Sequence, residues 1–332
     1  MLSKYSSMPS FNKYERGFIY AFIAILWQVS SQAITSMKAK PFIKWVGGKS
    51  QLIEQLKVLL PADFDNWKDV TYIEPFIGGG AMLFYMLQNY PNIKRFVIND
   101  INADLTKCYL TIRDNPKELI ESLKDIEHKF HALASEEERK IFFLETRSEY
   151  NQKNLGNVEN SSLFIFLNRT CFNGLYRVNK KGLFNVPFGR YTNPTICDEQ
   201  TILRDSEDLK RVEIQTGDFE DTFKHAQGNT LFYFDPPYRP LSNTSSFNDY
   251  SKESFNDDSQ RRLKAFCDKV HQHGYHFMLS NSDGKCKDEA DDFFDVLYEN
   301  YYIERVYASR NVNANPSKRG KLTEILVHNY HL

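Results

Sequence analysis

An acidic and aromatic tetrapeptide, Asp235-Pro236-Pro237-Tyr238, directly follows the apolar run of residues 231–234. The run is typical of a buried strand, and two consecutive prolines cannot continue its hydrogen-bond ladder, so we expect the strand to end at Asp235. A carboxylate and an aromatic ring would then lie at the carboxyl edge of a sheet, where open α/β sheets bind their ligands. For the tetrapeptide alone, a strand-ending turn with a solvated aspartate is the alternative.

A glycine-rich turn lies nearer the start of the chain. Residues 70–76 are strand-like, Gly78, Gly79 and Gly80 form a turn, and residues 81–90 are typical of an apolar helix. The glycines permit close approach of a ligand to the backbone, as in the first half of a nucleotide-binding βα unit. The full dinucleotide pattern GxGxxG is absent, because a leucine occupies position 83.

An acidic residue ends the next predicted strand. The apolar residues 95–98 lead into Asn99 and Asp100, and Asp100 lies 20 residues beyond Gly80. An acid at that spacing after a glycine turn suits the two hydroxyl groups of a ribose. The residue also fits an ordinary helix N-cap, because a helical pattern begins near residue 104, and both roles can hold at once.

A glycine pair at positions 47 and 48 precedes Lys49 and a helical pattern at residues 52–60. Such a turn lets backbone N–H groups and a lysine approach an anion. It is not a phosphate-binding P-loop, because that pattern requires glycine at position 43, where this chain has isoleucine. Taken alone, an ordinary loop-to-helix turn explains it.

Residues 160–197 contain basic, aromatic and asparagine side chains and no acidic one. Cations neutralise phosphates, arginine and asparagine can bind base edges with two hydrogen bonds, and aromatic rings can stack on bases. The glycines and prolines of this window predict loops or a hairpin rather than a long helix. A solvated basic loop is the alternative, but the local excess of positive charge favours contact with nucleic acid.

The elements that would position these residues alternate between strand and helix on both sides of a helical, charge-rich stretch at residues 104–150. Later strands are predicted at 211–214, 230–234, 275–279, 302–306 and 322–330, and later helices at 260–273 and 291–298. This alternation predicts an α/β sheet that carries an inserted subdomain. A polar loop at 239–258 could close over a substrate, and a second acid-free basic loop spans 305–323.

Bulk properties narrow the class of protein. The 332 residues carry 42 Lys+Arg against 43 Asp+Glu, and this balance neither indicates nor excludes nucleic acid. The five cysteines are scattered and form no CxxC pair, which argues against a zinc site or a disulfide framework and favours a reducing cytoplasm. The apolar run 18–29 resembles a signal-peptide core, but we favour an accessory helix or sequence upstream of a start at Met37.

Together and in this order, these stretches resemble the DNA adenine-N6 methyltransferases of the Dam type, the α-group or D12 class. The resemblance runs from about residue 40 to residue 330. The matching stretches are FIKWVGGK (42–49), YIEPFIGGG (72–80), IND (98–100), GLYRVNKKGLFNVPFGRY (174–191), GDF (217–219), DPPY (235–238), SNSD (280–283) and RGKLTEILVHNY (319–330). The resemblance implies a Rossmann-like S-adenosylmethionine-dependent methyltransferase sheet with an inserted, mainly helical DNA-recognition subdomain.

The same resemblance implies where S-adenosylmethionine would bind. The expected cofactor-binding residues are Trp45, Lys49, Phe76, Gly78, Gly80, Asp100, Asp218 and Phe219. Asp100 would bind the ribose hydroxyls, and Asp218 would accept from the adenine amino group while Phe219 lies against the ring. The product would be S-adenosylhomocysteine, and no metal is needed.

The resemblance also implies a mechanism. The expected catalytic residues are Asp235, Pro236, Pro237 and Tyr238. The target adenine would be flipped out of the duplex, and its N6 amino group would donate to the Asp235 carboxylate and the Pro236 carbonyl. Tyr238 would stack on the base, and the methyl group would move by direct in-line displacement.

The expected DNA contacts are Arg169, Asn173, Arg177, Asn179, Lys181, Pro187, Arg190 and Tyr191. In Dam-like enzymes of GATC specificity an arginine is usual at the position of Lys181. A lysine lacks the planar fork with which arginine binds a guanine. The sequence that this chain recognises therefore stays open.

We expect three parts: an N-terminal extension at 1–37, a catalytic domain formed by 38–105 and 205–332, and a target-recognition subdomain at 106–204. The expected partners are double-stranded DNA and a restriction endonuclease that acts on the same site, without a membrane. Dam-like housekeeping methylation is the alternative to restriction–modification. Cytosine-N4 methylation and a catalytically inactive DNA-binding relative are the competing functions.

Overall fold

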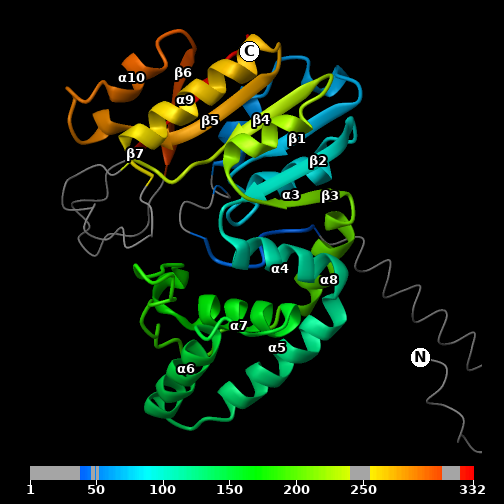
Figure 1. Ribbon diagram of the computed structural model, residues 1–332, viewed down its shortest axis with the longest axis vertical. Helices are drawn as coiled ribbons and strands as arrows, with labels where there is room; N and C mark the ends of the chain where they lie inside the picture. The colour runs from blue at the N-terminus through cyan, green and yellow to red at the C-terminus, as the bar shows by residue number, and fades with distance from the viewer. Residues whose placement is uncertain (1–37, 46–48, 50–51, 240–254, 309–321) are drawn as a thin grey trace, which may run out of the picture.

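The computed structural model describes residues 38–45, 49, 52–239, 255–308 and 322–332. Within them lies a seven-stranded sheet of order β3-β2-β1-β4-β5-β7-β6 (Figure 1). The strands are β1 Val70–Glu74, β2 Ile93–Asp100, β3 Val212–Thr216, β4 Thr230–Phe234, β5 His276–Ser282, β6 Tyr302–Ala308 and β7 Leu322–His328. The first five strands are parallel, whereas β7 runs antiparallel to both of its neighbours, β5 and β6.

The central strands are buried on both faces. All five residues of β1 and of β4 are buried, as expected for parallel strands covered by helices on each side. Successive side chains point to opposite faces, so Tyr72 and Tyr233 join one hydrophobic cluster while Ile73 and Phe232 join the other. The α/β sheet expected from the sequence is confirmed.

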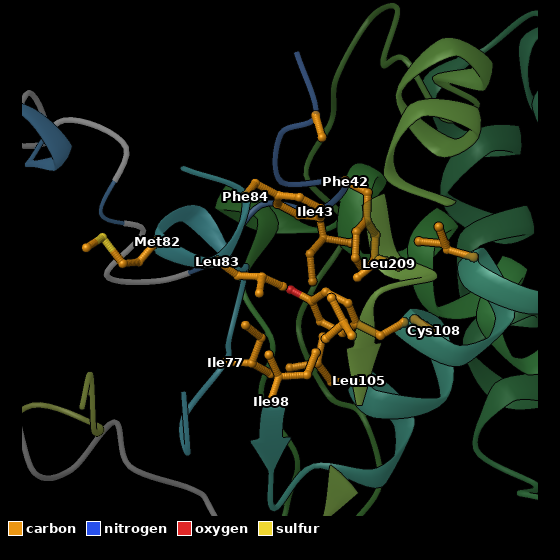
Figure 2. Close-up of a cluster of buried hydrophobic side chains, with 14 of the residues drawn as sticks. Phe42, Ile43, Ile77, Met82, Leu83, Phe84, Ile98, Leu105, Cys108 and Leu209 are labelled. Carbon is orange, nitrogen blue, oxygen red and sulfur yellow. The ribbon is translucent and has the colours of Figure 1, made fainter. Parts of the chain in front are cut away.

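Helices cover both faces of the sheet. The helices are α2 Ile53–Leu56, α3 Ala81–Asn89, α4 Ala103–Asp114, α5 Pro116–His131, α6 Glu136–Tyr150, α7 Asn157–Thr170, α8 Glu199–Leu209, α9 Asp257–Gln272 and α10 Phe293–Leu297, with short 3-10 turns η3 Lys57–Leu59, η4 Phe64–Asn66, η5 Phe172–Gly174, η6 Phe219–His225 and η8 Gly284–Cys286. One face packs against α9 and α10 through Leu263, Phe266 and Phe294. On the other face, side chains of α3, β2, α4 and α8 meet Phe42 and Ile43 of the N-terminal segment (Figure 2).

Helices α5, α6 and α7 form a group beside the sheet, drawn in green in the lower half of Figure 1. The apolar side chains on one side of these helices are buried, with Leu119, Leu123 and Phe130 fully covered. Ser135 and Glu138 form a capping box that starts α6, since each side chain accepts from the other residue's backbone N–H. The prediction of a helical region at 104–150 is confirmed as three helices.

The prediction of loops for the whole window 160–197 is wrong in its first third. Residues 157–170 form the buried helix α7, because the run from 160 to 173 has neither glycine nor proline and contains five consecutive apolar residues at 163–167. Loops begin where the glycines begin. From Cys171 to Phe188 the chain folds back on itself through two isolated bridges, Cys171 with Phe188 and Val178 with Phe184.

Strand β5 extends three residues beyond its predicted end. Ser280, Asn281 and Ser282 are polar, yet they stay in the sheet because each pairs with a residue of β7. Two predicted loops fall largely outside the described residues, which omit 240–254 and 309–321. Of the described ends of these loops, residues 257–258 begin α9, and residues 305–308 and 322–323 belong to β6 and β7.

In the part of the chain that the structure describes, none of the helices has the length and apolar character needed to cross a membrane. The apolar run at 18–29, with the proposed start at Met37, lies outside the described residues, and so does the glycine pair at 47 and 48.

Candidate active site

The polar residues singled out in the sequence converge because the parallel strands end at one edge of the sheet. Asp100 ends β2, Asp218 follows β3, and Asp235 directly follows β4. Strand β7 runs the other way, so its first residues rather than its last ones reach this edge. Glu324 of β7 pairs with Ser282 at the end of β5 and thereby joins the group.

Asp235 is held by two donors on one of its oxygens. Lys49 Nζ lies 2.6 Å from Asp235 Oδ1, and the Ser280 hydroxyl donates to the same atom at 3.1 Å. Burial raises the pKa of the Asp235 carboxyl, while the adjacent Lys49 ammonium acts in the opposite direction. Among the described residues no hydrogen bond falls on Oδ2, so one carboxylate oxygen stays available as an acceptor.

Of the carbonyls of the two prolines, that of Pro237 accepts a hydrogen bond from a described residue and that of Pro236 does not. Gln260 Nε2 of α9 donates to the Pro237 carbonyl at 3.3 Å, and Gln260 is itself held by Asn281. Within the described residues no donor reaches the carbonyl of Pro236. The free Asp235 oxygen and the Pro236 carbonyl are thus two acceptors on adjacent residues.

Tyr238 has one contact at its hydroxyl and one at the face of its ring. Its hydroxyl donates to Glu324 Oε2 at 2.5 Å, and Lys49 Nζ lies 4.4 Å from the centre of its ring. Glu324 was missed in the sequence. The available signal was a single acid within the apolar strand pattern of residues 322–327, which a solvated strand residue explains equally well.

The glycine turn is shaped by two aromatic side chains. Gly78 has φ +47, and a Cβ there would lie 2.8 Å from Trp45 Nε1. Gly80 has φ +74, and a Cβ there would lie 2.5 Å from the hydroxyl of Tyr109. Trp45 stacks on Tyr176 with ring centres 5.6 Å apart, which connects the turn to the segment that follows α7. Only glycine meets both the backbone and the space requirements at these two positions.

Asp100 lies beside this turn with each oxygen bonded to the backbone. Oδ2 accepts from Gly78 N at 3.2 Å, and Oδ1 accepts from Asn102 N at 2.9 Å. Burial raises the pKa of Asp100 to about 6, although its hydrogen bonds with the backbone lower it. The N-cap of α4 is Asn102, whose side chain accepts from two N–H groups of the first turn. Asp100 is therefore not the helix cap that the sequence allowed.

Asp218 and Phe219 have partners that the sequence did not reveal. Arg262 of α9 forms ion pairs with Asp218 and Glu220, and its guanidinium lies 4.6 Å from the centre of the Phe219 ring. Phe219 is 5% exposed, and the centre of its ring lies 5.2 Å from the centre of the Phe76 ring. Phe76 is less buried than Phe219. The structure brings all three predicted residues together, with Phe219 largely inside the core.

The predicted DNA contacts separate into an outward group and an inward one. Lys181 is exposed at the tip of the turn 179–182, which the Asn179 side chain holds by accepting from the N–H groups of Lys181 and Leu183. Arg177 bonds to the Asn185 side chain at 2.8 Å across the same hairpin. The two expected base-reading side chains therefore lie on one hairpin.

The remaining expected contacts lie around the base of this hairpin. Asn173, Pro187 and Arg190 are exposed, and Tyr191 lies under Lys44 at 4.6 Å from Nζ to the ring centre. Arg169 is different, because its Nη2 donates to the Phe42 carbonyl at 2.6 Å and its Nε is buried. The expectation that Arg169 contacts DNA has to be corrected: its place in α7 turns it into the interior, where it holds the N-terminal segment.

Comparison with known proteins gives a consistent result. The model of one family, the D12 class N6 adenine-specific DNA methyltransferases, matches residues 45–312. The type II methyltransferase M.MjaIII of Methanocaldococcus jannaschii is 46% identical over 297 residues, which is 89% of this chain and 100% of that protein. The type II methyltransferase M1.LlaDCHI of Lactococcus lactis is 39% identical over 88% of this chain and 95% of its own length. A DNA adenine methylase of Vibrio cholerae is 32% identical, with coverages of 87% and 95%.

Proposed function

The chain belongs to the D12 class of N6 adenine-specific DNA methyltransferases, and we propose that it transfers the methyl group of S-adenosylmethionine to a flipped adenine in double-stranded DNA. One observation carries this proposal. Asp235 has one oxygen held by Lys49 and Ser280, while its second oxygen and the adjacent Pro236 carbonyl accept nothing from the described residues. Two acceptors on adjacent residues match the two N–H groups of an adenine amino group.

The proposed chemistry needs no base of its own before the methyl group moves. The N6 amino group donates to Asp235 Oδ2 and the Pro236 carbonyl, which directs its lone pair away from the ring. S-adenosylmethionine supplies an electrophilic methyl group on a sulfonium. The N–C bond forms as the S–C bond breaks, the thioether leaves as S-adenosylhomocysteine, and N6 then loses one proton to water. Tyr238 stacks on the base, a contribution of about 1–3 kcal/mol.

The residues around the glycine turn fit this cofactor. Each oxygen of Asp100 accepts one backbone N–H, which leaves a lone pair on each for the two ribose hydroxyls. We propose Trp45, Phe76, Gly78, Gly80, Asp218 and Phe219 as the other groups at the cofactor. Lys49 was expected there as well. Its contact with Asp235 supports a position between cofactor and target base.

Cofactor affinity is expected to depend on pH through Asp100. The ionised carboxylate accepts from the ribose hydroxyls, and the pKa of Asp100 is raised to about 6. Protonation removes the acceptor, so affinity should be full above that value and fall as the pH drops through it, by about tenfold at pH 5. Isothermal titration with S-adenosylmethionine between pH 5 and 8 measures this. Asp100→Asn should bind weakly with no such slope, and an equal slope in that variant would contradict the assignment.

We propose residues 106–204 as the target-recognition subdomain and residues 38–105 with 205–332 as the catalytic domain. The support is the position of Arg177, Asn179 and Lys181 on one exposed hairpin. The exposed residues Asn173, Pro187 and Arg190 and the partly buried Tyr191 would contact the DNA backbone nearby. Arg169 is left out of this proposal because its guanidinium faces the interior.

Lys181→Ala is expected to relax sequence preference rather than abolish methylation. Loss of a base-edge contact should reduce discrimination at one base pair by about 1–3 kcal/mol, while the rate on an optimal site changes less. Initial rates on duplexes that differ at single base pairs measure the effect. Lys180→Ala, at the neighbouring exposed position of the same turn, is the matched control. Unchanged rate ratios for Lys181→Ala would rule out a base-reading role.

The reaction itself is tested by methylating DNA with labelled S-adenosylmethionine and resolving the nucleosides by mass spectrometry. N6-methyladenine is the expected product. N4-methylcytosine would favour the cytosine alternative, and the absence of transfer to any DNA would favour an inactive DNA-binding relative. A cytoplasmic location and a restriction endonuclease for the same site are part of the proposal. Mapping methylated adenines across a host genome would separate restriction–modification from Dam-like methylation.

A further inference from the structure

Glu324 reaches the functional edge of the sheet from near the start of an antiparallel strand, whereas the parallel strands reach this edge with their carboxyl ends. It belongs to the antiparallel strand β7, between Ser282 of β5 and Val306 of β6, and it is 7% exposed. A carboxylate at that depth loses much of its hydration, so it is retained where partners compensate for it. Its partners all belong to the site of Asp235.

The contacts of Glu324 connect three groups of that site. Oε2 accepts from the Tyr238 hydroxyl at 2.5 Å and lies 3.9 Å from Lys49 Nζ. Lys49, 3% exposed, is in turn 2.6 Å from Asp235 and 4.4 Å from the centre of the Tyr238 ring. One ammonium is thus shared by two carboxylates and covered by one aromatic ring.

The charges of this group have a consequence for methyl transfer. As carboxylates, Asp235 and Glu324 carry two negative charges against the single positive charge of Lys49, which gives a net charge of −1. Without Glu324 the same group would be neutral. The reacting pair carries one positive charge throughout, first on the sulfonium and then on the methylated N6, so a fixed negative charge nearby stabilises it with little reorganisation.

We propose that Glu324 is a positioning residue for methyl transfer. It fixes the Tyr238 ring by accepting from the Tyr238 hydroxyl, and its negative charge remains after the Lys49 ammonium has balanced the charge of Asp235. This inference rests on the proposed function of the Asp235 site. Two variants separate the hydrogen bond of Glu324 with Tyr238 from the negative charge of Glu324. Glu324→Gln keeps an acceptor for the Tyr238 hydroxyl but removes the charge, whereas Tyr238→Phe removes the hydroxyl contact and keeps the charge.

Two quantities are measured for these variants: kcat, and the preference for S-adenosylmethionine over S-adenosylhomocysteine. For Glu324→Gln we expect kcat to fall by about tenfold to a hundredfold with KM for DNA nearly unchanged, because the lost attraction becomes stronger as the positive charge moves from the sulfonium toward N6, beside Asp235. The preference for cationic S-adenosylmethionine over neutral S-adenosylhomocysteine should fall by about threefold or more, since a charge near the sulfonium has been removed. Tyr238→Phe should lower kcat and leave this preference unchanged.

Glu304→Gln is the matched control, because Glu304 is an exposed glutamate on the neighbouring strand β6. It should leave kcat and the cofactor preference unchanged. A Glu324→Gln variant with normal kcat and normal preference would overturn the inference, as would a fall in kcat without a change in preference. A wild-type protein that binds both cofactors but methylates no adenine would defeat the proposed function instead, and the affinity ratio of Glu324→Gln would still decide the role of Glu324.

Discussion

Replacing Asp235 by alanine is expected to reduce methyl transfer to DNA by about a thousandfold while the protein still folds and binds S-adenosylmethionine. The change removes the acceptor that orients the adenine amino group, and removing one such preorganised group typically costs a factor of about 10²–10³ or more. The fold should survive because Lys49 keeps a second carboxylate, Glu324, at 3.9 Å. Single-turnover methylation and isothermal titration with the cofactor give the two quantities.

Asp288→Ala serves as the control, because Asp288 is an exposed aspartate whose side chain accepts from the backbone N–H of Ala290. Near-normal turnover in Asp235→Ala would show that the proposed mechanism is wrong. A parallel loss of cofactor binding would instead assign Asp235 to the cofactor rather than to the target base.

Lys49→Met is expected to have the second large effect, on stability as well as on activity. Methionine fills a similar volume but leaves Asp235 and Glu324 without the cation that lies between them. Removing one partner of a buried ion pair typically lowers the free energy of unfolding by about 3–5 kcal/mol. Urea denaturation followed by circular dichroism measures this loss. Methyl transfer should fall together with stability, because Lys49 also holds Asp235 Oδ1.

The double variant Lys49→Met with Glu324→Gln separates charge from packing. It should recover part of the lost stability, because one of the two like charges has gone, and it should not recover activity. Lys44→Met is the control, since Lys44 is an exposed lysine five positions earlier whose ammonium lies over Tyr191. If Lys44→Met and Lys49→Met lost the same stability, the ion pair would not be the cause.

Sequence patterns identified the sheet and its functional edge because those features are local. A strand that ends at a proline pair, glycines that start a helix, and an acid at the end of the next strand each follow from short-range backbone chemistry. Parallel strands bring their carboxyl ends to one edge, so the acids that follow the predicted strands, Asp100 and Asp235, lie at the same edge. The helical region at 104–150 followed from its local sequence pattern as well.

Other features depended on contacts between distant parts of the chain. Arg169 is a cation in a basic window and was therefore expected to contact DNA. Its position on the buried helix α7 instead directs its guanidinium to the Phe42 carbonyl. Arg262, far along the chain from the GDF stretch, covers Phe219 and pairs with Asp218. Neither orientation follows from spacing, because the direction of a side chain depends on which neighbours the helix packs against.

The sequence by itself determined the α/β class, the family resemblance and the strand-end residues, since these depend on local periodicity and on turn chemistry. Only the tertiary structure decided how they are used. The antiparallel strand β7 brings Glu324 beside Tyr238, and Lys49 contacts Asp235 across 186 positions of sequence. Such pairings arise from long-range strand order and packing, which no short stretch of sequence specifies.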